Sequence, residues 1–313
     1  MTTTKPQRVL FIGGLGRSGT TIIEKLLNEL PTTFSVGETV HLWERGVQAN
    51  ERCGCGESFS SCTQWSAVGE LAFKGWNNVP LERVIDMRWS VDRSRRLPQM
   101  YNALRRGENT ADQNEYLGYV TKVLHAAAQA AGGAEVLLDS SKHLSTAALY
   151  ALDPSLDVRV LHIVRDPRGV AYSWMKQVAR PETDGEDMPT YSPSRTAFRW
   201  MTDNAGFETL GRRIPTLTMR YEDVLRDPEG SLRQMIELAG LEFEPAQLSF
   251  LDGNVANFAT PMHSVAGNPL RFGGEQTTLK LDDTWQSGLD QKSRRIVTSI
   301  TAPGLKHYDY PLR

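Results

Sequence analysis

The sequence lacks the features that several protein classes require. No hydrophobic run approaches the roughly 18 residues of a membrane span, and the polar segment 1–7 has no apolar signal-peptide core. No charge of one sign dominates either, because 35 Lys and Arg stand against 37 Asp and Glu, giving a formal net charge of −2. A chain without a basic field is a poor candidate for nucleic-acid binding. We therefore expect a cytoplasmic protein with no transmembrane segment and no nucleic-acid partner, in which any anion site is built locally.

Cysteine is scarce and confined to one stretch. The three cysteines are Cys53, Cys55 and Cys62. An odd, clustered set indicates either a metal or redox site or three reduced thiols in a local turn. Structural zinc sites usually have four protein ligands, and nothing in the sequence places the remaining candidate, His41, beside the cysteines. We expect reduced thiols and no bound metal, with a metal site as the alternative.

Short apolar segments alternate with segments of helical spacing. The apolar segments, typical of buried strands, are 8–13, 34–37, 135–139, 157–164 and 216–220. The helical segments include 20–30, 39–50, a helix opened by Pro167 and a last helix over 289–301. Strands that alternate with helices predict an α/β fold in which helices flank both faces of a parallel sheet.

The chain is expected to form one domain over residues 1–313. Its length is sufficient to bury a sizeable core. Residues from about 54 to 133 are predicted to be mainly helical and to form a substrate-facing insertion, or cap. A polar turn is predicted at 140–142, and an irregular segment at 257–281.

A glycine-rich loop lies between the first strand and the first helix. Residues 14–21 read GLGRSGTT. Glycines allow backbone N–H groups to converge on one anion, and the N-terminus of the following helix adds its dipole. Arg17 adds a permanent charge with a forked donor array. The strand, loop and helix together predict a phosphate site and a P-loop type of sheet.

This loop is not a Walker A motif. Gly14 and Gly19 have the Walker A spacing, but Thr20 stands where the lysine belongs, and the cation is Arg17. Asp139 ends an apolar segment and resembles a magnesium-binding Walker B residue. A kinase or NTPase therefore remains an alternative.

A second anion signature follows the strand at 157–164. Arg165 lies at the carboxyl end of that strand, and Ser173 follows eight residues later in the predicted helix. Ligands of open α/β sheets bind outside the carboxyl ends of the strands. A guanidinium and a hydroxyl at this edge suit a second phosphate, separate from the first.

The two loops together resemble the sulfotransferase family that uses 3′-phosphoadenosine-5′-phosphosulfate (PAPS). The pairing of GLGRSGTT with the later VRDPR segment and its serine carries this resemblance. The RYED segment at 220–223, the NPLRFG segment at 268–273, Trp285, the cysteine stretch and the final YDY also resemble bacterial members. The resemblance spans most of the chain and is weakest between Trp65 and Gly133.

The resemblance implies two groups of nucleotide-binding residues. Those for the 5′ end are Gly16, Arg17, Ser18, Gly19, Thr20 and Thr21. Those for the 3′-phosphate are Arg165, Ser173 and, in a late closing loop, Arg271, while Tyr221 contacts the adenine.

One departure from the family pattern concerns the adenine. Many cytosolic members have lysine at Arg17 and a tryptophan after the two threonines, where this chain has Ile22. The chain is more similar to the carbohydrate, tyrosyl-protein and bacterial branches. The adenine-stacking residue stays open between Phe272 and Trp174, of which Trp174 is expected to pack in the core.

Two residues compete for the role of general base. Glu38 follows the second predicted strand, where related members place a catalytic glutamate, and His41 lies three residues later. Histidine is the base in many cytosolic members. We predict Glu38 as the base, with His41 as the alternative, and Lys142 as a cation that steadies the sulfuryl oxygens.

The sequence therefore predicts an enzyme, a PAPS-dependent O-sulfotransferase that acts by in-line displacement. Such chemistry relies on positioning and electrostatics, as phosphoryl transfer does, and requires no metal. The acceptor is a small or medium-sized hydroxyl compound: a sugar, a lipid, a phenol or a secondary metabolite. Besides the kinase, the alternative is a non-catalytic protein that binds 3′-phosphoadenosine-5′-phosphate (PAP).

Overall fold

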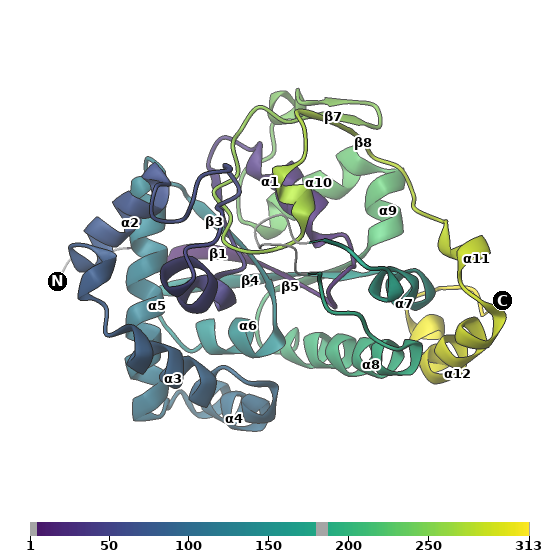
Figure 1. Ribbon diagram of the computed structural model, residues 1–313, viewed down its shortest axis with the longest axis horizontal. Helices are drawn as coiled ribbons and strands as arrows, with labels where there is room; N and C mark the ends of the chain where they lie inside the picture. The colour runs from purple at the N-terminus through teal and green to yellow at the C-terminus, as the bar shows by residue number, and fades with distance from the viewer. Residues whose placement is uncertain (1–4, 180–186, 313) are drawn as a thin grey trace.

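The centre of the molecule is a five-stranded parallel sheet. The computed structural model describes residues 5–179 and 187–312. The strands are β1 (Gln7–Gly13), β2 (Thr33–Gly37), β3 (Val136–Lys142), β4 (Leu156–Val164) and β5 (Thr216–Arg220). Their order across the sheet is β2-β3-β1-β4-β5, and all neighbours are parallel (Figure 1). The predicted fold class is confirmed.

Both faces of the sheet are buried, as β1 illustrates. Val9 and Phe11 belong to one core cluster, whereas Leu10 and Ile12 belong to the other. Alternate side chains of a strand point to opposite faces, so a strand covered on both sides is apolar throughout. The first cluster includes residues of α5 (Ala111–Ala130), α6 (Leu144–Tyr150) and α8 (Pro193–Leu210). The second includes residues of α1 (Thr20–Asn28), α9 (Tyr221–Arg226) and α10 (Pro228–Leu238).

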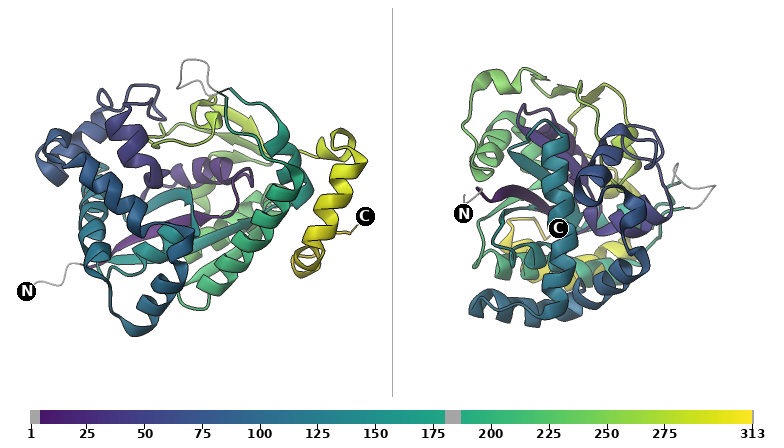
Figure 2. Two further views of the ribbon diagram at one scale, coloured as in Figure 1. Left: turned by 60° about the horizontal axis from the view of Figure 1, so that its bottom comes forward. Right: turned by 90° about the vertical axis from the view of Figure 1, so that its left-hand side faces the viewer.

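Further helices gather at the two ends of the molecule. Between β2 and β3 the chain forms α2 (Thr63–Phe73), α3 (Leu81–Val91), α4 (Leu97–Arg106) and α5, which lie together at the left of Figure 1 and again group together in Figure 2. At the other end lie α7 (Pro167–Met175), α11 (Trp285–Gly288) and α12 (Gln291–His307). Short 3₁₀ helices cover Thr39–His41, Trp76–Asn78, Ser94–Arg96, Pro245–Leu248 and Pro269–Phe272. No helix among the described residues is long and apolar enough to cross a membrane.

Three local predictions differ from the structure. The turn predicted at 140–142 is the end of β3, because Lys142 pairs with Gly13 of β1 after a shift in register beyond Phe11. The helix predicted over 39–50 is a 3₁₀ turn followed by a π-helix, Leu42–Gln48. The last helix runs to His307 rather than to about 301, through Pro303. In the first case tertiary pairing overrides the local turn signal.

The segment predicted to be irregular contains part of a second sheet. β6 (Leu251–Asp252), β7 (Val255–Asn257) and β8 (Gln276–Thr278) form a small antiparallel sheet in the order β6-β7-β8. Strands of two or three residues are too short to show a period of two in the sequence.

A buried carboxyl group joins α1 to β2. Glu24 of α1 is 3% exposed and hydrogen-bonds the hydroxyl of Ser35 in β2. The Ser35 amide donates to the side-chain oxygen of Asn28, at 3.0 Å. Burial raises the pKa of Glu24 to about 7, and the hydrogen bonds from Ser35 and Ser140 offset only part of that rise. The folded protein therefore favours the protonated form of Glu24.

We expect Glu24→Gln to stabilise the protein, and increasingly so as pH rises. An unfolded glutamate has a pKa of about 4.3, so wild-type stability falls between about pH 4.3 and pH 7, where only the folded state keeps the proton. Glutamine does not titrate and retains an oxygen that accepts from Ser35. The advantage of the variant should grow through this window and level off above pH 7, at no more than about 4 kcal/mol.

Urea unfolding at pH 5, 6, 7 and 8 measures this difference. Glu70→Gln, on the exposed surface of α2, is the matched control and should give a difference that does not change with pH. A constant difference for Glu24→Gln across this range would contradict the raised pKa.

Candidate functional site

All five parallel strands deliver one chemically active side chain to the same edge of the sheet. Arg17 follows β1, Glu38 follows β2, Lys142 ends β3, Arg165 follows β4 and Tyr221 follows β5. These five residues line one cavity of about 920 Å³. The carboxyl edge of a parallel sheet is where ligands of α/β proteins bind. The cavity is therefore the candidate active site.

The backbone of the first loop is curled beside this cavity. Gly14, Arg17 and Gly19 have φ values of 133°, 74° and 84°. A Cβ atom at Gly19 would lie 2.1 Å from the ring of Tyr221, so only glycine permits this contact. Helix α1 begins at Thr20, directly after the loop. A left-handed loop that leads into a helix N-terminus suits an anion.

Arg17 is held at the cavity wall without an ion pair to any residue that the structure describes. Its guanidinium carbon lies 5.2 Å from the centre of the Trp174 ring, and one nitrogen lies 3.1 Å from the sulfur of Met188. Its buried Nε has no hydrogen-bond partner among the described residues. Burial lowers the pKa of Arg17, and the nearby carboxylate of Glu38 raises it by less. A buried cationic donor that lacks a partner fits an anionic ligand.

Arg165 joins the second loop to the first. It is 8% exposed, and its Nη1 donates to the carbonyl oxygen of Arg17, at 3.0 Å. Its guanidinium lies 5.0 Å from the centre of the Tyr221 ring. Its Nη2 lies 3.4 Å from the carboxylate of Asp282. Ser173 of α7 lines the same cavity, so the structure brings both predicted anion loops to one site.

A network of buried contacts fixes the second loop. Asp166 caps α7 by accepting from the amide of Arg168, at 2.9 Å, and it also binds the Arg168 guanidinium. Trp200 Nε1 donates to the carbonyl oxygen of Arg165, at 2.9 Å. The hydroxyl of Tyr310 donates to the carbonyl oxygen of Val164, at 3.2 Å. The end of the chain thus supports the strand that carries Arg165.

Other predicted nucleotide ligands differ in their placement. Gly16, Gly19, Thr20 and Thr21 line the cavity, whereas the structure does not place Ser18 or Arg271 on its wall. Arg271 is 3% exposed, and its guanidinium donates to the carbonyl oxygens of Gly267, at 2.7 Å, and Arg52, at 3.3 Å. Its neighbours in the late loop, among them Gly267 and Gly273, do line the cavity. Arg271 therefore supports this loop through backbone contacts and does not itself line the cavity.

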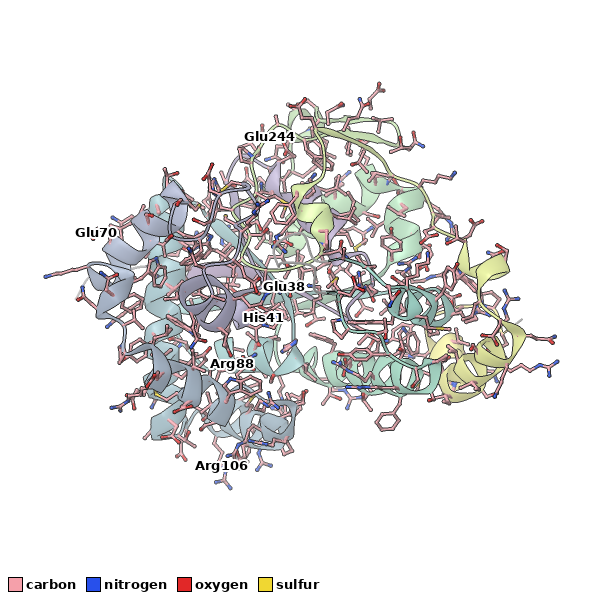
Figure 3. The ribbon with its side chains drawn as sticks, viewed as in Figure 1. Glu38, His41, Glu70, Arg88, Arg106 and Glu244 are labelled. Carbon is pink, nitrogen blue, oxygen red and sulfur yellow. The ribbon has the colours of Figure 1, made fainter. Side chains whose placement is uncertain are left out.

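Glu38 forms a buried ion pair with Lys142. The Lys142 ammonium hydrogen-bonds Glu38 Oε1, while His41 Nε2 lies 3.7 Å from Oε2. Glu38 and His41 lie together near the middle of the molecule, as Figure 3 shows. Burial raises the pKa of Glu38, but Lys142, with smaller contributions from His41 and Arg45, lowers it below its ordinary value. Glu38 is therefore ionised at neutral pH.

His41 lines the same cavity in its neutral form. Burial lowers its pKa to about 4, even though Glu38 opposes this shift. Its ring meets that of His143 edge to face, with centroids 6.0 Å apart. Both predicted base candidates therefore reach the site, one as a carboxylate and the other as a neutral imidazole.

Lys142 has an unusual backbone conformation for a residue with a side chain. Its φ is 65°, in the left-handed region, and its ammonium also donates to the carbonyl oxygen of Ser140, at 2.9 Å. Arg17 has a positive φ as well. Such conformations cost on the order of 1–3 kcal/mol each and persist where surrounding contacts enforce them. Surrounding contacts thus hold Arg17 and Lys142 in place.

Asp139 is not placed to hold a metal in the cavity. It is fully buried, accepts hydrogen bonds from the Thr39 hydroxyl and the Ser141 amide, and does not line the cavity. Burial raises its pKa to about 6, although these hydrogen bonds oppose the rise. A Walker B aspartate needs an oxygen directed at the nucleotide site, so the position of Asp139 behind the cavity lining does not favour the kinase alternative.

The far part of the cavity contains residues that the sequence did not single out. Ser94 and Leu97 come from the segment 54–133, Arg45 and His143 lie beyond Glu38, and Arg199, Thr202 and Asp203 come from α8. Trp174, expected in the core, lines the cavity and stacks on Tyr191 with ring centroids 4.4 Å apart. No motif marks these positions, because they meet only through the packing of distant helices.

The cysteine stretch has a partner that the sequence did not suggest. Cys53, Cys55 and Cys62 lie beside His263, with all four ligand atoms within 4.8 Å of one another. His41, the candidate named from the sequence, lies at the cavity with Glu38 instead. The fourth potential ligand is therefore His263.

Comparisons with known proteins agree with this geometry. Residues 9–245 match the Sulfotransferase family. Human carbohydrate sulfotransferase 3 is 25% identical over 176 residues, which are 52% of this chain and 35% of that protein, so the match spans about a third of the relative's length.

Two solved structures share the fold. The sulfotransferase domain of the Synechococcus olefin synthase is 19% identical, with 96% of this chain and 97% of that chain covered and a TM-score of 0.50. A sulfotransferase domain from the curacin biosynthetic pathway is 16% identical, with 99% and 100% covered and a TM-score of 0.51. The family resemblance and the fold predicted from the sequence are both confirmed.

Proposed function

The chain belongs to the sulfotransferase family, and we propose that it transfers a sulfuryl group from PAPS to a hydroxyl of an acceptor. One observation carries this proposal: Arg17 and Arg165 line a single cavity together with the ionised Glu38. Two separate cationic sites suit a nucleotide with phosphate groups at both its 5′ and 3′ positions. A carboxylate in the same cavity suits the removal of a proton from an acceptor.

The residues present fit such a donor. The first loop, residues 16–21, would hold the 5′ end: all of these except Ser18 line the cavity, and the buried Nε of Arg17 has no partner among the described residues. Arg165 and Ser173 would hold the 3′-phosphate, and Tyr221 would contact the adenine. Arg271 would act by positioning the late loop, since its guanidinium binds the carbonyl oxygens of Gly267 and Arg52. The donor supplies the sulfuryl group and leaves as PAP.

The chemistry of the chain would be positioning and charge stabilisation. Glu38 accepts the proton of the acceptor hydroxyl while its oxygen forms the new bond to sulfur. Arg17 and the loop amides stabilise the bridging oxygen as its bond to sulfur breaks in line. Lys142 keeps Glu38 ionised, and its positive charge stabilises the sulfuryl oxygens. These steps use charges of the protein alone, and magnesium has no part in them.

The insertion at 54–133 would form one wall of the acceptor site within a single domain. Ser94 and Leu97 bring it to the cavity, which Arg199 and Asp203 of α8 also line. The charged groups of both signs on α8 suit a polar acceptor. A screen of sugars, phenols, lipids and other hydroxyl compounds with labelled PAPS would test the activity, and turnover with ATP and magnesium alone would contradict it.

PAP should stabilise the protein far more than AMP or ATP does. Arg165 and Ser173 supply a site for the 3′-phosphate, which AMP and ATP lack. A ligand at 100 times its dissociation constant adds about 2.7 kcal/mol of stability. Thermal unfolding at equal nucleotide concentrations measures the effect. Equal shifts with AMP and PAP would show that there is no 3′-phosphate site.

Arg165→Ala and Arg17→Ala should have different kinetic effects. The 3′-phosphate has the same charge before and after transfer, so Arg165 contributes uniform binding and its loss should weaken PAP and PAPS alike. Arg17 faces charge that develops during bond breaking, so its loss should lower the single-turnover rate at saturating PAPS. Arg165→Lys is the matched control, because it keeps the positive charge but changes the contact with the Arg17 carbonyl oxygen. A normal rate for Arg17→Ala would refute its assigned role.

Glu38→Gln should lower the rate by about 10²- to 10⁴-fold and leave PAP affinity nearly unchanged. Glutamine keeps the shape of the side chain and removes its basicity. His41→Ala is the control, because His41 is the other candidate base at the cavity. If Glu38→Gln retains wild-type turnover and His41→Ala loses it, the base is His41.

The pH profile gives a second readout of the same assignment. A carboxylate base loses activity as pH falls through its pKa, and Lys142 holds that pKa down. Lys142→Ala should therefore move the acid limb of kcat/KM to higher pH, whereas Lys142→Arg should keep it near the wild-type position. If the acid limb of Lys142→Ala stays at the wild-type pH, this limb does not report the titration of Glu38.

A further inference from the structure

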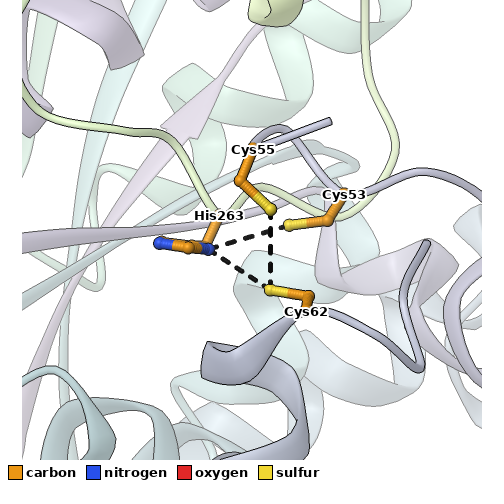
Figure 4. Close-up of side chains that lie close together, drawn as sticks. All are labelled: Cys53, Cys55, Cys62 and His263. Carbon is orange, nitrogen blue, oxygen red and sulfur yellow. Dashed lines mark hydrogen bonds between the residues drawn. The ribbon is translucent and has the colours of Figure 1, made fainter. Parts of the chain in front are cut away.

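Four side chains with soft or nitrogen ligand atoms meet at one point of the fold. Three come from the segment 53–62, and the fourth, His263, comes from a loop about 200 residues later. His263 Nδ1 lies 3.3 Å from Cys62 Sγ and 4.0 Å from Cys53 Sγ, and Cys55 Sγ lies 3.7 Å from Cys62 Sγ (Figure 4). We propose that Cys53, Cys55, Cys62 and His263 bind one structural zinc ion.

Three of the six distances between the ligand atoms are close to those of a tetrahedral site, and all six are within 4.8 Å. With Zn–S bonds of about 2.3 Å and Zn–N bonds of about 2.0–2.1 Å, tetrahedral geometry separates two sulfurs by about 3.8 Å and a sulfur from a nitrogen by about 3.5 Å. The observed separations of 3.7, 3.3 and 4.0 Å lie around these values. All three cysteines of the chain are free thiols. Hydrogen bonds between thiols are weak, so they alone give little reason for this convergence.

The backbone between the cysteines is shaped for close approach. The amide of Gly54 donates to the carbonyl oxygen of Ser264, at 3.0 Å, and a Cβ atom at Gly54 would lie 2.7 Å from the carbonyl oxygen of Met262. Gly56 has a φ of 94°, and its amide donates to the carbonyl oxygen of Cys53, at 2.9 Å. The two glycines of the CGCG segment therefore allow the cysteine loop to turn and to lie against the loop of His263.

Contacts outside the cluster fix the positions of the ligands. Trp65 Nε1 donates to the carbonyl oxygen of His263, at 2.7 Å, and the His263 ring stacks on Phe34 at an interplanar angle of 23°. Cys62 directly precedes α2, whose N-terminus favours the negative charge of a thiolate. Cys53 and Cys62 are buried. Supporting contacts of this kind orient the ligands of metal sites.

The ligand set selects zinc and a structural role. Thiolates and an imidazole in a tetrahedral arrangement are the ligands of structural zinc. Four protein ligands leave no open position for a substrate or water. The site joins the start of the helical insertion to the loop at 262–265, and that loop pairs with β2, because Glu38 N donates to the carbonyl oxygen of Val265, at 2.8 Å. The zinc ion would therefore fix the backbone beside Glu38.

Elemental analysis of the full chain, purified without chelators from cells grown with zinc, tests the proposal first. We expect about one zinc per chain, as a single four-ligand site requires. A mercurial reagent should release this zinc in step with modification of the three thiols, which are all the cysteines of the chain. Protein reconstituted with cobalt should show the thiolate-to-cobalt charge-transfer band of a tetrahedral site.

Single variants test the ligand assignment. His263→Ala should lose most of the zinc, and His125→Ala, on the exposed side of α5, should keep all of it. If His263→Ala fails to fold, the zinc content, thiol release and cobalt spectrum of the wild-type protein still decide the matter.

Three results would overturn the proposal. The first is wild-type protein without stoichiometric metal whose three thiols all react at once. The second is a disulfide between two of the three cysteines, found by mass spectrometry in protein purified without reductant. The third is stoichiometric iron in place of zinc. Because these readouts do not use sulfuryl transfer, their outcome is independent of the proposed activity.

Discussion

Five parallel strands must end at the same edge of their sheet, and every residue proposed for catalysis depends on that constraint. The strands are buried on both faces, so their order and register are fixed by packing rather than by the site. β1 lies between β3 and β4, which places the first loop between Lys142 on one side and Arg165 on the other. The chemistry is therefore assembled from residues far apart in sequence, each of which ends or follows a strand of the sheet.

The electrostatics of the site follow from the close approach of charged side chains at this edge of the sheet. The chain has a net charge of −2, yet Arg17, Lys142 and Arg165 line one cavity together with the ionised carboxylate of Glu38. A carboxylate that is buried without a partner would take up a proton. The ion pair with Lys142 prevents that, and the left-handed backbone of Lys142 brings its ammonium to Glu38. A base that is ionised at neutral pH thus depends on the strain at the end of β3.

Local signals in the sequence predicted the parts of the site that belong to one strand and its following loop. The apolar run of the first strand and the glycines of the first loop located Arg17, and the strand before Arg165 located the second loop. The sequence did not indicate that β3 continues through Ser140 and Ser141, because this extension depends on pairing with β1. It also did not indicate His263 or the direction of Arg271, since each of these depends on a contact between segments about 200 residues apart.

The cysteine cluster and Arg271 act on the same late loop from two sides. Around the cluster, the Gly54 amide binds the carbonyl oxygen of Ser264, and the loop continues into the backbone pairing with β2. Farther along, the Arg271 guanidinium binds the carbonyl oxygen of Arg52, the residue before the first cysteine. The cysteine stretch is thus the common anchor for the backbone beside Glu38 and for the loop that lines the cavity. The buried Arg271 connects the late loop, which lines the cavity, to Arg52 at the start of the insertion. This contact holds the late loop and the insertion in one relative position.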